Sequence, residues 1–141
     1  MYLIDTNVWL EDLLHQQRAA EADRLFKEIP SRLLFISSFA LFSIGIILTS
    51  RKQQELFVTL LNDLFNRGNV KILEPSIEDL HSISLLSKKS GLDFDDSFQA
   101  FISVLRNLKL VSFDSDFVAK GFAILSRWQA IENFKNTISK L

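Results

Sequence analysis

Short apolar runs alternate along this chain with longer stretches in which apolar residues recur every three or four positions. The runs lie at residues 2–4, 33–36, 70–73 and 110–113 and predict four β-strands. The stretches between them predict helices, because apolar side chains at that spacing share one helix face. Strands alternating with longer helices indicate an α/β fold: a three-layer α/β/α sandwich with a mainly parallel sheet of four or five strands.

Capping and breaking residues set the expected helix ends. Ser37 or Ser38 can cap a helix that runs to about residue 49, and Ser76 with Asp79 resembles a capping box. Pro30 and Gly68 stop two other helices. The predicted helices are residues 7–14, 22–29, 38–49, 56–65, 77–90 and 96–105, with a closing helix over 125–141. With no linker or repeat between them, residues 1–141 form a single predicted domain.

The most apolar segment, residues 33–48, raises the alternative of a membrane span. It is shorter than the roughly 20 residues that a span requires, and it contains three serines and a glycine. A buried strand running into a buried helix explains it better. Asp5 interrupts the N-terminal apolar run, so no signal peptide is predicted, and the absence of cysteine is compatible with a reducing compartment. We therefore expect a cytoplasmic protein.

Charge and composition narrow the chemistry. The net charge of −1 provides no global attraction to nucleic acid, so any such surface must be a local patch, and the basic residues are scattered. His15 and His81, the two histidines, fall in or near predicted helices away from the acidic segments, which argues against a histidine-rich zinc site. The 13 phenylalanines mostly have core spacing and are interpreted as packing residues rather than base-stacking surfaces.

Three short acidic segments, residues 4–7, 93–96 and 113–117, lie where a strand ends or a helix begins. In a parallel sheet these positions meet at one edge, beyond the carboxyl ends of the strands. A group of carboxylates without a fixed cation requires a divalent metal or protons. Hard cations such as Mg²⁺ or Mn²⁺ prefer carboxylate oxygens, and a metal so held can activate water against a phosphodiester.

Each acid also has a simpler explanation. Asp5 can cap a helix, Asp95 or Asp96 can stabilise a helix N-terminus, and residues 114–116 can form a turn. For each acid taken singly, the structural explanation is at least as good as a catalytic role. The three acids taken together at one edge of the sheet favour a metal-binding site. No phosphate-binding glycine loop is present. RNA, DNA and smaller phosphate esters all remain open as substrates.

The three segments, in this order and spacing, resemble the PIN-domain family, and most closely its VapC-like toxin ribonucleases. The resemblance spans nearly the whole chain and rests on residues 4–7, on Gly91, Leu92, Asp96 and Ala100, and on residues 111–117. It implies a metal-dependent endoribonuclease that acts on RNA, often as a homodimer and often neutralised by a small antitoxin protein.

The resemblance also implies roles for single residues. Asp5, Asp96 and Asp114 would be the catalytic residues and would bind Mg²⁺ or Mn²⁺, with Asp116 as a substitute ligand for Asp114. Supporting hydrogen bonds would come from Thr6 or Asn7 and from Ser112.

The chain departs from the family pattern at Ser43. Such proteins usually carry a glutamate in the helix after the second strand, and no carboxylate lies between Glu28 and Glu55 here. A serine can ligate or hydrogen-bond a metal-bound water, but it brings no charge. Either Asp93 and Asp95 restore part of the missing charge and the ribonuclease is active, or the domain is a catalytically impaired module that binds RNA or a protein partner.

Overall fold

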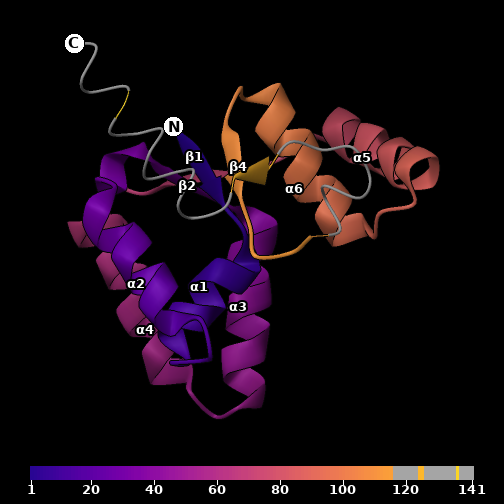
Figure 1. Ribbon diagram of the computed structural model, residues 1–141. Coiled ribbons are helices and arrows are strands. Elements are labelled where there is room, and N and C mark those ends of the chain that lie inside the picture. Colours follow the sequence, from indigo (N-terminus) through magenta and orange to yellow (C-terminus); the bar gives the residue numbers. More distant parts are fainter. Residues whose placement is uncertain (116–123, 126–135, 137–141) are drawn as a thin grey trace.

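Five parallel strands form the centre of the molecule in a computed structural model that describes residues 1–115, 124–125 and 136. The strand order is β3-β2-β1-β4-β5, and every described pairing is parallel (Figure 1). The strands are β1 (Tyr2–Ile4), β2 (Leu34–Ser37), β3 (Lys71–Leu73), β4 (Lys109–Val111) and β5 (Ile124–Leu125). The predicted α/β fold with a parallel sheet is confirmed.

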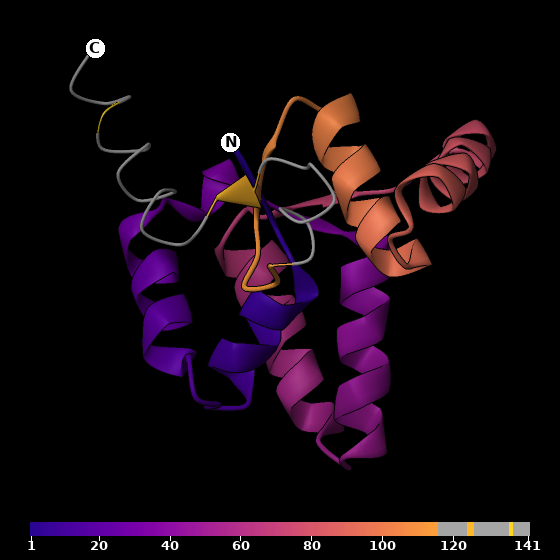
Figure 2. The ribbon, with the colours of Figure 1, turned by 45° about the vertical axis from the view of Figure 1, so that its right-hand side comes forward.

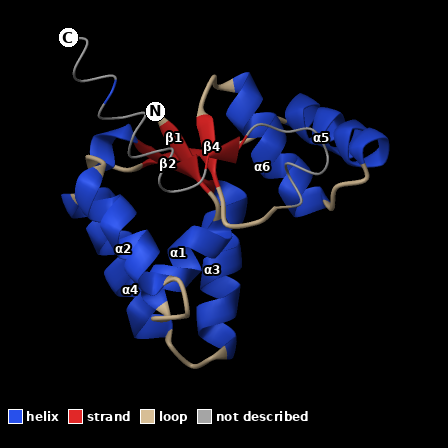
Figure 3. Ribbon diagram, in the orientation of Figure 1, coloured by secondary structure: helices blue, strands red, loops and turns tan. Residues whose placement is uncertain are grey.

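Helices cover both faces of this sheet (Figures 1 and 3). Four of them lie together on one face: α1 (Thr6–Leu13), α2 (Ala19–Glu28), α3 (Ser38–Ser50) and α4 (Gln54–Leu61). The other face carries α5 (Ile77–Ser90) and α6 (Phe94–Leu105). A rotated view shows α5 and α6 on one side of the strands and α1 and α2 on the other (Figure 2). The result is the three-layer arrangement expected from the sequence.

Alternation along the short strands creates two separate cores. Tyr2 and Ile4 of β1 pack with residues of α1 to α4, whereas Leu3 packs with residues of α5 and α6. β2 divides in the same way, with Ile36 on the first face and Phe35 on the second. Successive side chains of a strand point to opposite faces, so a strand buried on both faces is apolar throughout.

The predicted caps are present. Ser37 ends β2 and caps α3, because its Oγ accepts a hydrogen bond of 3.1 Å from the backbone N–H of Ala40. Ser76 and Asp79 form a reciprocal capping box at α5, with bonds of 2.8 and 3.1 Å. Gly91 ends α5 with φ of 72°, a left-handed conformation that glycine adopts without strain.

Several boundaries differ from the prediction. β4 ends at Val111, so Phe113 lies in the loop beyond it, and α6 begins two residues earlier than expected, at Phe94. The helix expected over 56–65 divides into α4 and a π-helical turn, η2 (Asn62–Arg67), while η1 (Ser31–Leu33) is a 3-10 turn.

The start of the predicted closing helix is wrong, since Ile124 and Leu125 pair with β4 as a strand. Ladder hydrogen bonds to a neighbouring strand outweigh helical spacing in the sequence here. The remainder of that helix, apart from Asn136, lies outside the described residues. Among the described helices, none combines the length and apolar character that a membrane crossing demands.

Candidate active site

The order in which strands are added to the sheet reverses between β1 and β4. The first three strands run outward in the order β1, β2, β3, and the chain then returns to place β4 on the other side of β1. In open α/β sheets, ligands bind at such a switch point, beyond the carboxyl ends of the strands. A cavity of about 370 Å³ lies here, bordered by Asp5 after β1 and Asp114 after β4.

The structure brings the three predicted acids together around this cavity. Asp5 directly follows β1, Asp96 lies in the first turn of α6, and Asp114 lies in the loop after β4. Asp93 and Asp95 are both exposed, but Asp95 borders the cavity and Asp93 does not. Of the two extra acids considered from the sequence, Asp95 therefore adds its charge at the cavity itself. Asp116 lies outside the described residues.

Asp5 is a buried carboxylate held by three donors. Its side chain, 6% exposed, accepts hydrogen bonds from the Thr6 backbone N–H at 2.7 Å, the Gln99 side chain at 3.1 Å and the Ser112 hydroxyl at 2.7 Å. Burial raises the pKa of Asp5 above its ordinary value, the three hydrogen bonds act against that shift, and the charge of Asp114 adds to it. Asp5 thus caps α1, as the simpler explanation proposed, and also faces the cavity.

The supporting residues form one hydrogen-bonded network. Ser112 Oγ donates to Asp5 and accepts from the Asn7 side chain at 3.1 Å and from the Asp114 backbone N–H at 3.0 Å. Asn7 in turn accepts from the Phe113 backbone N–H at 3.2 Å. These bonds tie the loop after β4 to the start of α1, so they fix where Asp114 stands relative to Asp5.

Asp96 carries the clearest electrostatic signature in the site. Burial, as the largest cause, and repulsion from Asp95, Asp5, Asp114 and Asp93 together raise its pKa from 3.8 to about 7. Among the described residues, no lysine or arginine borders the cavity to offset these charges. A cation that entered the cavity would relieve both causes of the shift.

The helix α3 contributes an uncharged side to the cavity. Phe39, Ser43 and Ile47 are spaced four residues apart, which places them on one helix face, and all three border the cavity, as does Leu10 of α1. Ser43 therefore stands at the site, as the resemblance expected for the glutamate it replaces. The negative charge comes from the ends of β1 and β4 and from α6 instead.

Gln99 also belongs to the candidate site, although the sequence analysis did not identify it. It is 1% exposed, lies on α6 and borders the cavity. Its Nε2 donates to Asp5, while its Oε1 is buried without a hydrogen-bond partner among the described residues. Buried carbonyl groups without a partner are uncommon, and a water, an ion or a ligand can satisfy such a group. A polar residue at a core position of α6 was the available signal in the sequence.

The donor set suits a hydrated divalent ion. Within the described part of the chain, no three acidic or histidine side chains lie close enough to enclose a metal. Mg²⁺ does not require such a cage, because it usually keeps several waters and is held by one or two carboxylates. One or two of the carboxylates of Asp5, Asp96 and Asp114, together with waters, would meet that requirement.

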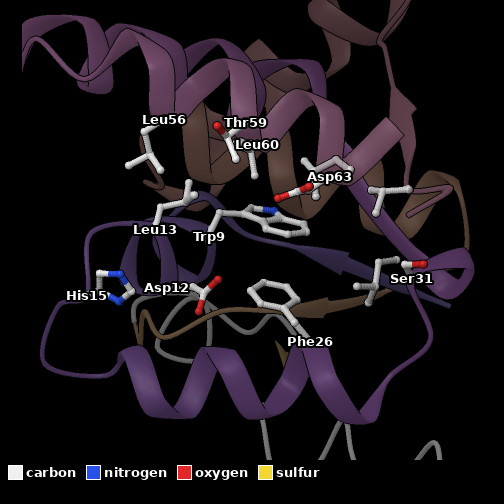
Figure 4. A pocket seen from close by; sticks show the side chains of 13 residues that line it. Trp9, Asp12, Leu13, His15, Phe26, Ser31, Leu56, Thr59, Leu60 and Asp63 are labelled. Atoms are coloured by element: carbon white, nitrogen blue, oxygen red, sulfur yellow. The ribbon is translucent and has the colours of Figure 1, made fainter. Parts of the chain in front are cut away.

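A second cavity, of about 340 Å³, lies between α1, α2 and α4 and is mainly apolar (Figure 4). Trp9 and Phe26 face each other in it, with ring centroids 4.5 Å apart, and leucines of α4 lie above them. Its carboxylates, Asp12 and Asp63, come from separate elements. Trp9 also donates a hydrogen bond from Nε1 to the carbonyl of Ile4 at 3.2 Å. This bond links one side chain of the second cavity to the last residue of β1.

The chain belongs to the PIN-domain family, whose model matches residues 2–123. A search of the curated proteins finds no relative that matches this sequence.

Solved structures of toxin proteins share the fold at low sequence identity. VapC20 of Mycobacterium tuberculosis, described as a sarcin–ricin loop cleaving toxin, has a TM-score of 0.75 at 18% identity, covering 89% of this chain and 99% of that chain. A toxin–antitoxin complex from Klebsiella pneumoniae gives 0.70 at 20%, with 92% and 99% covered. VapBC2 of Rickettsia felis, bound to a promoter DNA fragment, gives 0.64 at 20%, with 89% and 96% covered.

Proposed function

We propose that this protein is a metal-dependent endoribonuclease of the VapC-like toxin type, which hydrolyses phosphodiester bonds in RNA. The observation that carries the proposal is the convergence of Asp5, Asp96 and Asp114 on one cavity at the topological switch point. The raised pKa of Asp96, to about 7, supports it. A cluster of carboxylates that no basic side chain of the described residues neutralises is suited to binding a cation. Membership of the PIN-domain family supports the reaction class.

In this proposal, Asp5, Asp96 and Asp114 hold Mg²⁺ or Mn²⁺, and Asp116 is a further candidate ligand. The bound ion would activate a water and stabilise negative charge on the phosphodiester. Ser112 and the Thr6 N–H orient the Asp5 carboxylate through bonds of 2.7 Å each. Asn7 fixes the loop that carries Asp114, and Ser43 can hydrogen-bond a water of the metal's hydration shell.

An RNA cleavage assay tests the proposal. The purified protein is incubated with single-stranded and structured RNA in Mg²⁺ or Mn²⁺, with and without EDTA. We expect cleavage that EDTA abolishes and that Asp5→Asn reduces by at least about 100-fold, in line with losing a group that stabilises charge in the transition state. Cleavage unchanged in Asp5→Asn would refute the assignment. A DNA substrate and a small phosphate monoester, run in parallel, test the substrate class.

Ser43 favours a second candidate function, a PIN-fold module that is catalytically impaired and binds RNA or a protein partner. The uncharged α3 side of the cavity provides one carboxylate fewer than the family pattern, so metal affinity should be lower. Calorimetry with Mn²⁺ separates the two candidates. Millimolar or tighter binding that Asp96→Asn abolishes supports the ribonuclease, whereas no binding together with intact RNA supports the impaired module.

The proposed partners follow from the toxin assignment. The similar structures include a complex of a toxin with its antitoxin, and we propose a small antitoxin partner for this protein in the cytoplasm. We also propose a homodimer. Phe42 and Ile46 on α3 are 62% and 71% exposed, although helices of monomers usually turn such residues inward. Sedimentation analysis of Ile46→Glu tests this, since a charge at a dimer interface should produce monomers.

A further inference from the structure

The candidate active site has two chemically different walls. One wall carries the carboxylates of Asp5, Asp95, Asp96 and Asp114, and the other carries the apolar side chains of Leu10, Phe39 and Ile47. We propose that the apolar wall binds the base of one unpaired nucleotide by stacking on Phe39, while the adjacent phosphate lies at the acidic wall with the metal. This inference rests on the proposed ribonuclease function and adds to it a base-binding position at Phe39.

Phe39 is held firmly enough to serve as a stacking surface. Its ring packs against Phe98 of α6 with centroids 5.5 Å apart and a 41° tilt, and Phe98 is 3% exposed. Phe98 in turn contacts Phe94 at 6.4 Å. A ring that packing already immobilises loses little conformational freedom when a base stacks on it. Such stacking is sequence-tolerant and occurs with bases that are not paired in a duplex.

Ser43 suits a neutral base. It lies one turn from both Phe39 and Ile47 on the face of α3 that borders the cavity. A carboxylate at this position would have to lose water beside an apolar base, which costs free energy unless a cation compensates it. A hydroxyl carries no such penalty and can donate to or accept from the edge of a base.

Gln99 offers a hydrogen-bond acceptor to a ligand in the cavity. Its amide is oriented by the bond from Nε2 to Asp5, which leaves Oε1 as an acceptor. That oxygen is buried and lacks a partner among the described residues. An exocyclic amino group of a base, a ribose hydroxyl or a water could satisfy it. A purely ionic ligand, such as the metal with phosphate alone, would leave the apolar wall unused.

The charge of the cavity explains why a base subsite is needed. Within the described part of the chain no basic side chain borders it, so a phosphate would reach the acids together with a cation. Contacts to the base then provide attraction that does not depend on charge. The volume, about 370 Å³, is within the range of small-ligand sites, roughly 300–1,000 Å³.

A fluorescent nucleotide that contains no cleavable phosphodiester tests the inference. The probe is 2-aminopurine ribonucleoside 5′-monophosphate in Mg²⁺, whose fluorescence falls when the base stacks. We expect quenching on binding, and we expect Phe39→Leu to weaken binding by about five- to tenfold, the lower part of the range for losing one aromatic stack. Phe39→Tyr keeps the ring and should bind as the wild type does.

The control variant is Val104→Ala, which shortens an exposed apolar side chain of α6 outside the cavity and should change nothing. Ribose 5-phosphate, which lacks the base, should bind the wild type weakly and be insensitive to Phe39→Leu. The 2′-deoxy form of the probe tests whether the ribose is recognised. Equal affinity for the ribose and deoxyribose probes would mean that the base alone is recognised, as the stacking proposal expects. Weaker binding of the deoxyribose probe would assign a contact to the 2′-hydroxyl as well.

Two outcomes overturn the inference in distinguishable ways. If RNA is cleaved in an EDTA-sensitive manner but Phe39→Leu binds the probe as the wild type does, the base subsite is wrong and the ribonuclease assignment stands. If calorimetry detects no Mn²⁺ binding and RNA remains intact, the proposed function fails and the inference fails with it. Melting temperatures of all three variants, compared with the wild type, establish that each is folded.

Discussion

Asp96 is expected to destabilise the protein at neutral and alkaline pH, and Asp96→Asn should relieve this. In the folded state, burial and four neighbouring carboxylates raise its pKa from 3.8 to about 7. A carboxyl group whose pKa is higher in the folded state costs stability as the pH rises from the unfolded pKa to the folded one. The cost is therefore absent near pH 4, grows between pH 4 and 7, and is complete at pH 8.

The magnitude follows from the size of the shift. A difference of about 3 pH units corresponds to roughly 4 kcal/mol at about 1.4 kcal/mol per unit. Asp96 is partly exposed, so solvent screening reduces this to about 1–2 kcal/mol. The mutation also removes a carboxylate from the first turn of α6, where it is favourable by roughly 0.3–1 kcal/mol. We expect a net gain of about 1 kcal/mol, or about 3–4 °C in melting temperature.

The assay is urea and thermal unfolding at fixed ionic strength, from pH 4.5 to 8.5, with EDTA present to exclude metal. Asp93→Asn is the matched control, because it removes a charge from the same segment at an exposed position with no side-chain capping bond. Its effect should stay below about 0.5 kcal/mol. An Asp96→Asn protein that is no more stable than the wild type at pH 8, or whose gain does not shrink toward pH 4.5, would refute the reasoning.

Three further predictions concern the same site. Ser43→Glu adds a carboxylate to the cavity and should tighten Mn²⁺ binding about tenfold, roughly 1.4 kcal/mol, measured by calorimetry against Ser43→Ala as the uncharged control. Ser112→Ala removes the hydroxyl that bonds Asp5, Asn7 and the loop N–H, and should cost about 1–3 kcal/mol in urea unfolding; a loss under about 0.3 kcal/mol would contradict the network. Mn²⁺ in excess should raise the melting temperature of the wild type but not of Asp96→Asn, and EDTA should reverse the rise.

The sequence determined the positions of β1 to β4 and the edge of the sheet at which the candidate site lies. Apolar runs separated by capped, periodic helices give a parallel sheet, and a parallel sheet brings its strand ends to one edge. Asp5, Asp96 and Asp114 could therefore be grouped before any coordinates were known. The capping signals at Ser37 and Ser76 succeeded for a similar reason, because they depend on interactions within four residues.

The misjudged elements depended on neighbours distant in sequence. Ile124 and Leu125 form β5 because β4 offers them a ladder of hydrogen bonds, which helical spacing cannot reveal. Gln99 belongs to the site because α6 packs so that its amide reaches Asp5, 94 residues away in the chain. Whether Asp93 or Asp95 would face the cavity depended on the start of α6, and the first turn brings Asp95 to it.

The sequence by itself thus determined which groups are candidates for the chemistry, since the three acids and the serine at position 43 are visible as residue types at characteristic spacing. Only the tertiary structure decided what surrounds them: the three donors on Asp5, the unpaired oxygen of Gln99 and the apolar wall around Phe39. The reason is physical. Local propensity acts over a few residues, whereas burial, and with it the raised pKa of Asp96, arises from elements that meet only when the whole chain is folded.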